Sequence, residues 1–300
     1  MAKPRKILIG TPIRLGLTST YISGFIDVMR AQIPNLTIEF CILEGPSVNL
    51  ARNEIAHYAK AIKADELLFI DSDLKWTTEH FKRILQHEDL DIVGGIYCKK
   101  MGGDPQWLMN AMPGGLDPNA EVCEVGEIAT GFMKIRVEKV FGAIEKTFPE
   151  LKFHCYKEFK NIDGSGFAHE YFPMGVTGTR HPRNRLTRIK EELKNLRKSD
   201  DLETEASRIQ RMSDAIAKID QACYDDQPPG LLRGEDYYFC YLAREAGCKI
   251  YADFGMTVLP HVGNAAYPIT PNLVGVKHLL ELPDTPQPAW SDELIKPHNS

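Results

Sequence analysis

Residues 66–73 read ELLFIDSD, an almost wholly apolar run that ends in two aspartates, Asp71 and Asp73. Such a run is typical of a strand that is covered on both faces of a parallel sheet. Further strand signals occur at 6–9, 36–43 and 91–97. Amphipathic helices are predicted between the strands at 20–33, 48–63 and 78–87. This alternating order predicts an α/β domain with a doubly wound, mostly parallel, Rossmann-like sheet. Ligands of such sheets bind beyond the carboxyl ends of the strands.

The second half of the chain is less regular. Its predicted elements are strands at 106–109, 122–125, 132–137 and 249–252, a helix at 234–246 and a glycine-rich loop at 159–178. Residues 183–222 lack glycine and proline and alternate charged with aliphatic residues at helical spacing, which predicts an inserted helical hairpin over 180–227. We therefore expect one domain over 1–272, interrupted by this hairpin, and a proline-rich C-terminal tail at 273–300.

Composition limits the class of protein. A chain of 300 residues with 43% hydrophobic content can bury a full core, and its net charge of −5 argues against a surface that is basic throughout. No apolar run approaches the length of a transmembrane helix, and the start MAKPRKILIG lacks the long apolar region of a secretory leader. The seven cysteines include no C-x-x-C pair, which argues against a disulfide framework or a structural zinc site. These features predict a cytoplasmic protein.

The two aspartates at the end of the 66–70 run are the strongest chemical signal. In an extended segment, side chains two residues apart point the same way, so Asp71 and Asp73 could face one hard divalent cation. Such a cation needs oxygen ligands and can neutralise a diphosphate at the same time. The alternative is that these aspartates only begin a turn before the helix at Thr77.

An apolar strand followed by Asp71-Ser72-Asp73 and a Thr-Thr helix start resembles the D-x-D region of GT-A glycosyltransferases, especially the inverting, family-2-like enzymes. Three further segments resemble that family in the same order: Gly10-Thr11-Pro12, Val48–Asn53 and Gly234-Glu235-Asp236. The resemblance covers residues 6–98 well and 230–263 moderately, and it leaves the hairpin and the tail unmatched. It implies a GT-A fold with a nucleotide-sugar-binding half at 1–98 and an acceptor and catalytic half at 99–178 and 228–272.

The resemblance also implies an activity. The enzyme would be a hexosyl- or pentosyltransferase that uses Mn²⁺, or Mg²⁺, and a nucleotide-diphosphate sugar as donor, with inversion at the anomeric carbon. The residues it places at the donor are Thr11, Pro12, Arg14, Asn49, Arg52, Asp71 and Ser72. A guanidinium near a helix start, such as that of Arg52, can hold a phosphate or a base edge. The alternative for Arg52 is a solvated charge on a helix surface.

Acidic residues begin the helix predicted at 234–246. By resemblance Asp236 is the base that deprotonates the acceptor hydroxyl, and Glu235 positions the acceptor. The alternative is that both are there because negative side chains are favoured at helix starts.

A late histidine in Leu259-Pro260-His261-Val262-Gly263 resembles the residue that completes the metal site with Asp71 and Asp73. Imidazole with two carboxylates suits manganese somewhat better than magnesium. A structural histidine is the alternative, and Asp253 is a weaker metal candidate. Thr130-Gly131-Phe132 resembles the acceptor-side segment of the family, and Trp107 could stack on a sugar or belong to the core.

The predicted hairpin has arms of opposite charge. Residues 180–198 contain eight Lys or Arg and two Glu, whereas residues 199–226 contain eight acidic and three basic residues. The arms could simply complement each other as solvated helices. The basic arm could instead hold a polyanionic acceptor, such as an anionic glycan or a hydroxymethylated base in DNA. A third reading is an oligomerisation arm.

Other functions remain open at this level. A nucleotidyltransferase can share the topology and the metal aspartates, although no basic, glycine-rich loop follows the first strand. A non-catalytic nucleotide- or sugar-binding protein and a metal phosphohydrolase are further alternatives. The sequence has no G-x-x-x-x-G-K-[ST] loop, which argues against a P-loop enzyme, and no G-x-G-x-x-G fingerprint after the first strand.

Overall fold

The computed structural model describes residues 4–14, 16–99, 107–117, 119–154, 167–177, 207, 210, 213–214, 231–256 and 259–261. The predicted hairpin at 180–227 therefore lies outside the described residues, apart from four helical positions. The segment 228–272 lies only in part within them. The tail at 273–300 also lies outside them, so the predicted division into domains stays a prediction.

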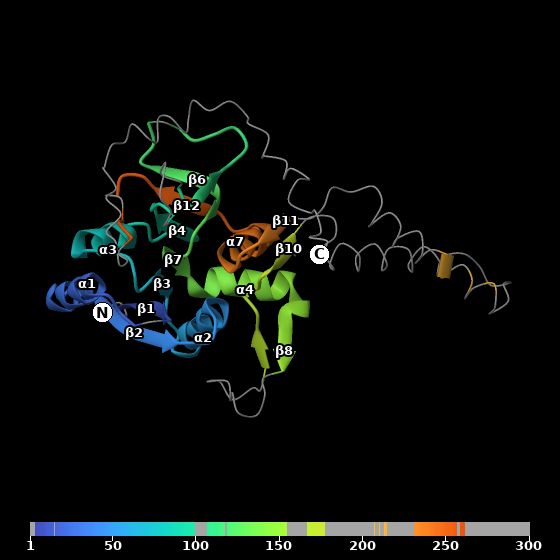
Figure 1. The fold of residues 1–300 in the computed structure, drawn as a ribbon, viewed down its shortest axis with the longest axis horizontal. Helices are drawn as coiled ribbons and strands as arrows, with labels where there is room; N and C mark the ends of the chain where they lie inside the picture. Colours follow the sequence, from blue (N-terminus) through green and yellow to red (C-terminus); the bar gives the residue numbers. More distant parts are fainter. Residues whose placement is uncertain are drawn as a thin grey trace, which may run out of the picture.

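An eight-stranded sheet forms the centre of the fold, in the order β2-β1-β3-β7-β4-β12-β6-β5 (Figure 1). Its strands are β1 Arg5–Ile13, β2 Leu36–Glu44, β3 Glu66–Ile70, β4 Ile92–Gly95, β5 Met109–Ala111, β6 Val122–Ile128, β7 Phe132–Arg136 and β12 Ile250–Asp253. Two short antiparallel pairs lie outside this sheet. They are β8 Lys152–His154 with β9 Phe167–His169, and β10 Gly175–Thr177 with β11 Leu231–Arg233.

Most strands of the sheet share one direction. Strand β1 is parallel to β2 and β3, and β12 is parallel to β4. Strand β7 lies antiparallel between β3 and β4, so β4 runs the same way as β3. Strand β6 is antiparallel to β12, and β5 is antiparallel to β6. Only β6 and β7 oppose the other six strands, which confirms the predicted α/β fold with a mostly parallel sheet.

Helices cover both faces of this sheet, as a doubly wound fold requires. The helices are α1 Ser19–Arg30, α2 Val48–Ala61, α3 Thr78–Leu85, α4 Val137–Thr147 and α7 Glu235–Glu245, with a 3₁₀ turn, η1, at Pro149–Leu151. Helices α1 and α3 share one buried apolar cluster with the sheet, and α2, α4 and α7 share another on the opposite face (Figure 1).

Local sequence signals explain several helix ends. Thr77 caps α3: its side chain accepts a hydrogen bond from the backbone of His80, whose ring bonds back to the Thr77 backbone. Ser47 stands at the N-cap of α2 without a side-chain capping bond, because its hydroxyl bonds to Asn49 Oδ1 at 2.5 Å instead. After α7, Gly247 adopts φ +83°, a left-handed conformation that favours glycine.

Strand β1 is longer than the sequence predicts. It continues through Gly10-Thr11-Pro12 to Ile13, because β2 pairs with it along all nine residues. Its pairing with β3 ends at Gly10, so Pro12 lies where no strand needs its missing N–H on that side. The predicted loop at 159–178 likewise contains two short strands, β9 and β10.

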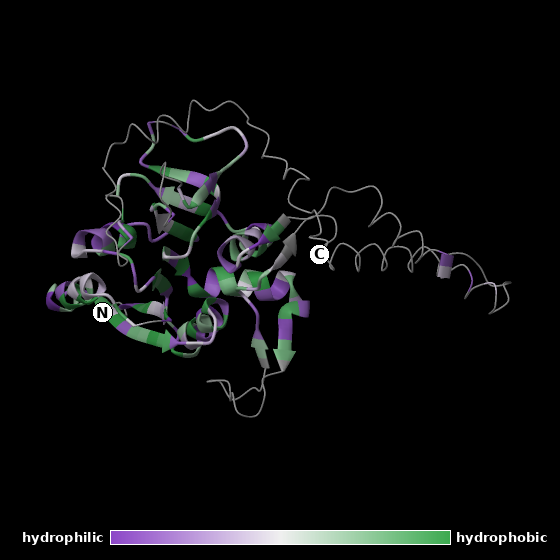
Figure 2. Cartoon of the chain, viewed as in Figure 1, coloured by the Kyte–Doolittle hydropathy of each residue, from purple (hydrophilic) through white to green (hydrophobic). Residues whose placement is uncertain are grey.

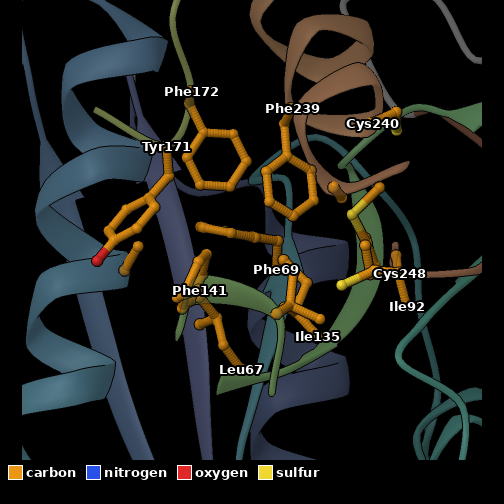
Figure 3. Packing of buried hydrophobic residues seen from close by; sticks show 14 of the residues in the cluster. Leu67, Phe69, Ile92, Ile135, Phe141, Tyr171, Phe172, Phe239, Cys240 and Cys248 are labelled. Carbon is orange, nitrogen blue, oxygen red and sulfur yellow. The ribbon is translucent and has the colours of Figure 1, made fainter. Parts of the chain in front are cut away.

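An aromatic cluster joins helix α7 to the centre of the sheet (Figure 3). The Phe172 ring lies 5.4 Å from that of Phe69 on β3 and stacks at 4.5 Å on that of Phe239 on α7. All three side chains are fully buried. Hydrophobic residues follow the central strands, whereas the helices carry both hydrophobic and hydrophilic residues (Figure 2). The packing therefore fixes the start of α7 against the sheet.

Candidate functional site

A cavity of about 410 Å³ opens at the carboxyl ends of β1, β2 and β3. It is lined by Pro12, Ile13, Arg14, Gly45, Pro46, Ser47, Val48, Asp71, Ser72 and Asp73. A larger hollow of about 700 Å³ lies at the opposite edge of the sheet, around the starts of β1 and β3. Ligands of doubly wound sheets bind at the carboxyl edge, so the smaller cavity is the candidate site.

The two aspartates of this cavity lie in a turn and not in an extended strand. Strand β3 ends at Ile70, and the backbone N–H of Leu74 donates to the carbonyl of Asp71 at 3.1 Å. The expectation that an extended backbone directs both side chains the same way is therefore wrong. The turn nevertheless brings Asp71, Ser72 and Asp73 to the same cavity wall.

The guanidinium of Arg52 connects this turn with the start of α7. Its Nη2 lies 3.0 Å from Asp71 Oδ1 and 3.2 Å from Asp71 Oδ2. Its Nη1 donates to Glu235 Oε1 at 2.5 Å and to Asp236 Oδ1 at 2.7 Å. The residue is only 2% exposed. Arg52 is therefore neither a solvated helix charge nor part of the cavity wall, but a buried cation shared by three carboxyl groups.

These carboxyl groups outnumber the guanidinium that holds them. Burial alone would lower the pKa of Arg52, but the charges of Asp236, Asp71 and Glu235 raise it above its usual value, so the guanidinium stays charged. Burial and the adjacent charge of Asp236 raise the pKa of Glu235. The corner thus has an excess of negative charge, which favours the approach of a further cation.

Asp236 is held in place from two directions. Its Oδ1 accepts hydrogen bonds from Arg52 Nη1 at 2.7 Å and from the hydroxyl of Thr130 at 2.7 Å. Thr130 is fully buried, whereas the side chain of Asp236 is 25% exposed. This carboxylate is therefore both oriented and accessible, as a general base must be. The Thr130-Gly131-Phe132 motif drew attention to this segment, but nothing in the sequence indicated that Thr130 bonds to Asp236.

Gly131 fills a position where a side chain has no room. Its N–H donates to the Tyr97 hydroxyl at 2.6 Å, and its carbonyl accepts from the Asp71 N–H at 2.8 Å. A Cβ at this position would lie 2.3 Å from the Tyr97 oxygen and 2.9 Å from Asp71 Oδ2. Glycine therefore allows Tyr97 and Asp71 to approach each other closely. Sequence reasoning did not find Tyr97.

Asn53, next to Arg52 on α2, holds the loop that carries the aromatic cluster. Its Oδ1 accepts hydrogen bonds from the backbone N–H groups of Tyr171 at 2.7 Å and Phe172 at 3.1 Å. Because Phe172 stacks on Phe239, this loop supports α7 and with it the carboxyl groups that contact Arg52. Arg52 and Asn53 thus both support the start of the site: Arg52 contacts the carboxyl groups of α7, and Asn53 holds the loop that packs against α7.

His261 lies beside the aspartate turn. It forms an isolated β-bridge with Leu74, and the N–H of Lys75 donates to the Pro260 carbonyl at 3.0 Å. Its ring meets that of Tyr97 edge-on at 5.0 Å and is mostly buried. Among the described residues, however, no group of three or more His, Cys, Asp or Glu side chains is arranged to hold a metal. The role of His261 as a metal ligand therefore stays a prediction.

Three further candidates have other partners. Neither Thr11 nor Asn49 lines the cavity. The Thr11 hydroxyl is buried and hydrogen-bonded to that of Tyr21, and Asn49 Oδ1 accepts a hydrogen bond from the Ser47 hydroxyl. Asp253 is fully buried in β12 and bonds to Arg83 at 2.8 and 3.0 Å. This ion pair links β12 to α3 and gives Asp253 a structural role in place of the suggested metal site. Of the expected donor residues, the cavity wall includes Pro12, Arg14, Asp71 and Ser72.

No protein-family model matches the chain, and no curated protein matches it. Among solved structures it has a likeness to A197 from STIV, with 22% sequence identity over 45% of this chain and 65% of that chain. The TM-score of this likeness is 0.32.

None of the described helices combines the length and the apolar character that are needed to span a bilayer.

Proposed function

We propose that this chain is a metal-dependent glycosyltransferase that transfers a sugar from a nucleotide-diphosphate donor to an acceptor hydroxyl, with inversion. The observation that carries the proposal is the convergence on Arg52 of carboxyl groups from two distant segments. Asp71 comes from the end of β3, and Glu235 and Asp236 come from the start of α7. A donor subsite and a base would thus lie side by side at the carboxyl edge of the sheet.

The residues present fit a divalent cation that shares its ligands with a diphosphate. Asp71 and Asp73 offer oxygen atoms on one cavity wall, and the surrounding carboxyl groups exceed the charge of Arg52. Protein sites of Mg²⁺ commonly use one or two carboxylates and take the remaining ligands from phosphate and water. When bound, the cation would neutralise the charge of the departing diphosphate.

The chain's own residues would handle the acceptor. Asp236 would take the proton from the acceptor hydroxyl, while Thr130 and Arg52 hold its Oδ1 and keep the carboxylate oriented. Glu235, whose Oε1 accepts a hydrogen bond from Arg52, would position the acceptor. Arg14, on the cavity wall, would face the phosphates.

Donor hydrolysis tests the proposal without knowledge of the acceptor. The full chain is incubated with a panel of nucleotide-diphosphate sugars and Mn²⁺, and release of the nucleoside diphosphate is measured. We expect turnover of at least one donor, and its loss on chelation of the metal. Asp73→Asn should lower turnover by roughly 100-fold, the usual effect of removing one charge-stabilising group from an active site.

Asp27→Asn is the matched control, because Asp27 is an exposed residue on α1 outside the cavity. It should keep wild-type turnover. Wild-type turnover in Asp73→Asn would contradict the proposal, provided that circular dichroism shows both variants folded. Consumption of nucleoside triphosphates with pyrophosphate release would indicate a nucleotidyltransferase instead.

The acceptor stays a prediction. The basic arm at 180–198, which could hold an anionic glycan or DNA, lies outside the described residues, and so does most of the remaining hairpin that could support an oligomer.

A further inference from the structure

Arg52 contacts its carboxyl groups unequally. Its bonds to Glu235 and Asp236 on α7 are 2.5 and 2.7 Å long, whereas both distances to Asp71 are at least 3.0 Å. A single nitrogen, Nη2, faces both oxygens of Asp71, so this pair lacks the two parallel bonds of a fork-to-fork arrangement. The contact with Asp71 is therefore the weaker side of the bridge.

The guanidinium is not otherwise held in this position. Its Nε is buried and has no hydrogen-bond partner among the described residues. An unsatisfied donor of this kind costs free energy, so the carboxyl groups, and not a complete hydrogen-bond network, must hold the side chain of Arg52 in place.

Asp71 can be reached from the cavity without moving Arg52. The side chain of Asp71 is 25% exposed and lines the cavity, whereas that of Arg52 is 3% exposed and lies behind it. A divalent cation entering the cavity would meet Asp71 from the open side. Two cations at one carboxylate repel each other, and this repulsion is strong where water is largely excluded.

We propose that Arg52 is a built-in counter-cation that holds Asp71 in the absence of metal and releases it when a divalent cation binds. The inference rests on the proposed function, since it concerns the same site. Arg52 would then keep only its partners on α7, so that occupation of the donor side is transmitted directly to Asp236. Arg52 is in this view a positioning residue that competes with the cation for Asp71.

If Arg52 competes with the cation, its removal should strengthen Mn²⁺ binding, whereas removal of a residue that supports the site should weaken it. Mn²⁺ alone is titrated into the full chain, and free Mn²⁺ is followed by electron paramagnetic resonance. Arg52→Met removes the competitor and should lower the Kd for Mn²⁺ by roughly tenfold or more, the scale of a charge-assisted hydrogen bond. A residue that supports the site would instead make Mn²⁺ binding weaker when removed.

Arg14→Met controls for the general effect of removing a positive charge. Arg14 lines the same cavity but is exposed. Its loss should lower the Kd by less than about fivefold, because exposed charges interact weakly across solvent. An equal gain in both variants would overturn the proposal, because it would show long-range attraction without competition at Asp71.

Stability provides a second readout, because loss of Arg52 leaves three carboxyl groups without their counter-charge. Mn²⁺ should raise the melting temperature of Arg52→Met more than that of the wild type. Arg52→Lys keeps the charge but not the reach of the guanidinium, and should also bind Mn²⁺ more tightly than the wild type does. If Arg52→Met does not fold, Arg52→Lys decides. If neither variant gains affinity, or neither folds even with Mn²⁺, the proposal is wrong.

These measurements use no nucleotide sugar. Tighter Mn²⁺ binding by Arg52→Met in a chain that hydrolyses no donor would support the competition and refute the transferase. Donor hydrolysis combined with weaker Mn²⁺ binding by Arg52→Met would do the reverse.

Discussion

Asn53→Ala tests whether α2 supports the catalytic corner through the 171–172 loop. The substitution removes the one oxygen that accepts the backbone N–H groups of both Tyr171 and Phe172. Both of those residues are fully buried, and Asn53 itself is only 6% exposed. Water therefore cannot replace the lost acceptor without opening the loop.

The magnitude follows from the two donors that are left without a partner. A buried donor that loses its acceptor costs about 1–3 kcal/mol, and alanine also leaves a small void. The two donors share one oxygen and can relax together, so we expect a loss of about 2–4 kcal/mol in the free energy of unfolding. Loosening of the Phe172–Phe239 stack should also displace α7 and lower donor hydrolysis.

Urea denaturation followed by tryptophan fluorescence measures the stability. Asn119→Ala is the matched control, because Asn119 is exposed and its loss should change stability by less than about 0.5 kcal/mol. A loss below about 1 kcal/mol in Asn53→Ala would refute the argument, because that is the scale of one ordinary hydrogen bond. It would mean that the loop is held by its aromatic packing alone.

Two other positions give sharp expectations. Gly131→Ala places a Cβ 2.3 Å from the Tyr97 oxygen, so stability should fall by about 1–3 kcal/mol with loss of donor hydrolysis. Gly142→Ala on α4 should be neutral or stabilising in the same urea assay, because its Cβ would make only an ordinary van der Waals contact, 3.8 Å from Glu138 Oε1. Burial alone would raise the pKa of Asp253, but hydrogen bonds, first from Arg83, lower it below 3.8. The ionised Asp253 therefore stabilises the folded state above about pH 4, and this stabilisation is lost as the pH falls through the folded-state pKa. Asp253→Asn should cost about 1.5–3 kcal/mol at pH 7 and flatten the fall in stability below pH 4 in thermal melts; an unchanged acid profile would refute this.

Local sequence signals were sufficient for the first half of the sheet. Strand β3 was predicted with its observed bounds, Glu66–Ile70, because an apolar run of that length fits a strand that is buried on both faces. The sequence placed the start of α3 at Thr77 or Thr78, because a hydroxyl before an amphipathic stretch satisfies helix N–H groups, and Thr77 is the cap. Both features depend on residues that are close in the chain.

Long-range pairing was not predictable in the same way. Strand β7 lies antiparallel between β3 and β4, and nothing in its own sequence indicates which strands it pairs with. The partners of Arg52 on α7 are more than 180 positions away, so no spacing rule could connect them. The sequence identified Arg52, Glu235 and Asp236 one by one, but as a phosphate ligand and an acid pair, and not as a single buried assembly.

The positions of Arg52 and Asn53 explain why one short helix can couple the two halves of the site. Consecutive helical residues point about 100° apart, so α2 can direct Arg52 to the carboxyl groups and Asn53 to the 171–172 backbone. Moving α7 away from the sheet would break the bonds of Arg52 to Glu235 and Asp236 and leave the buried guanidinium with Asp71 alone, which costs several kcal/mol. Releasing Asp71 alone breaks only the longest bonds, and a cation entering the open cavity can replace them. Exchange at Asp71 is therefore the least costly change available to this corner, and it requires no opening of the fold.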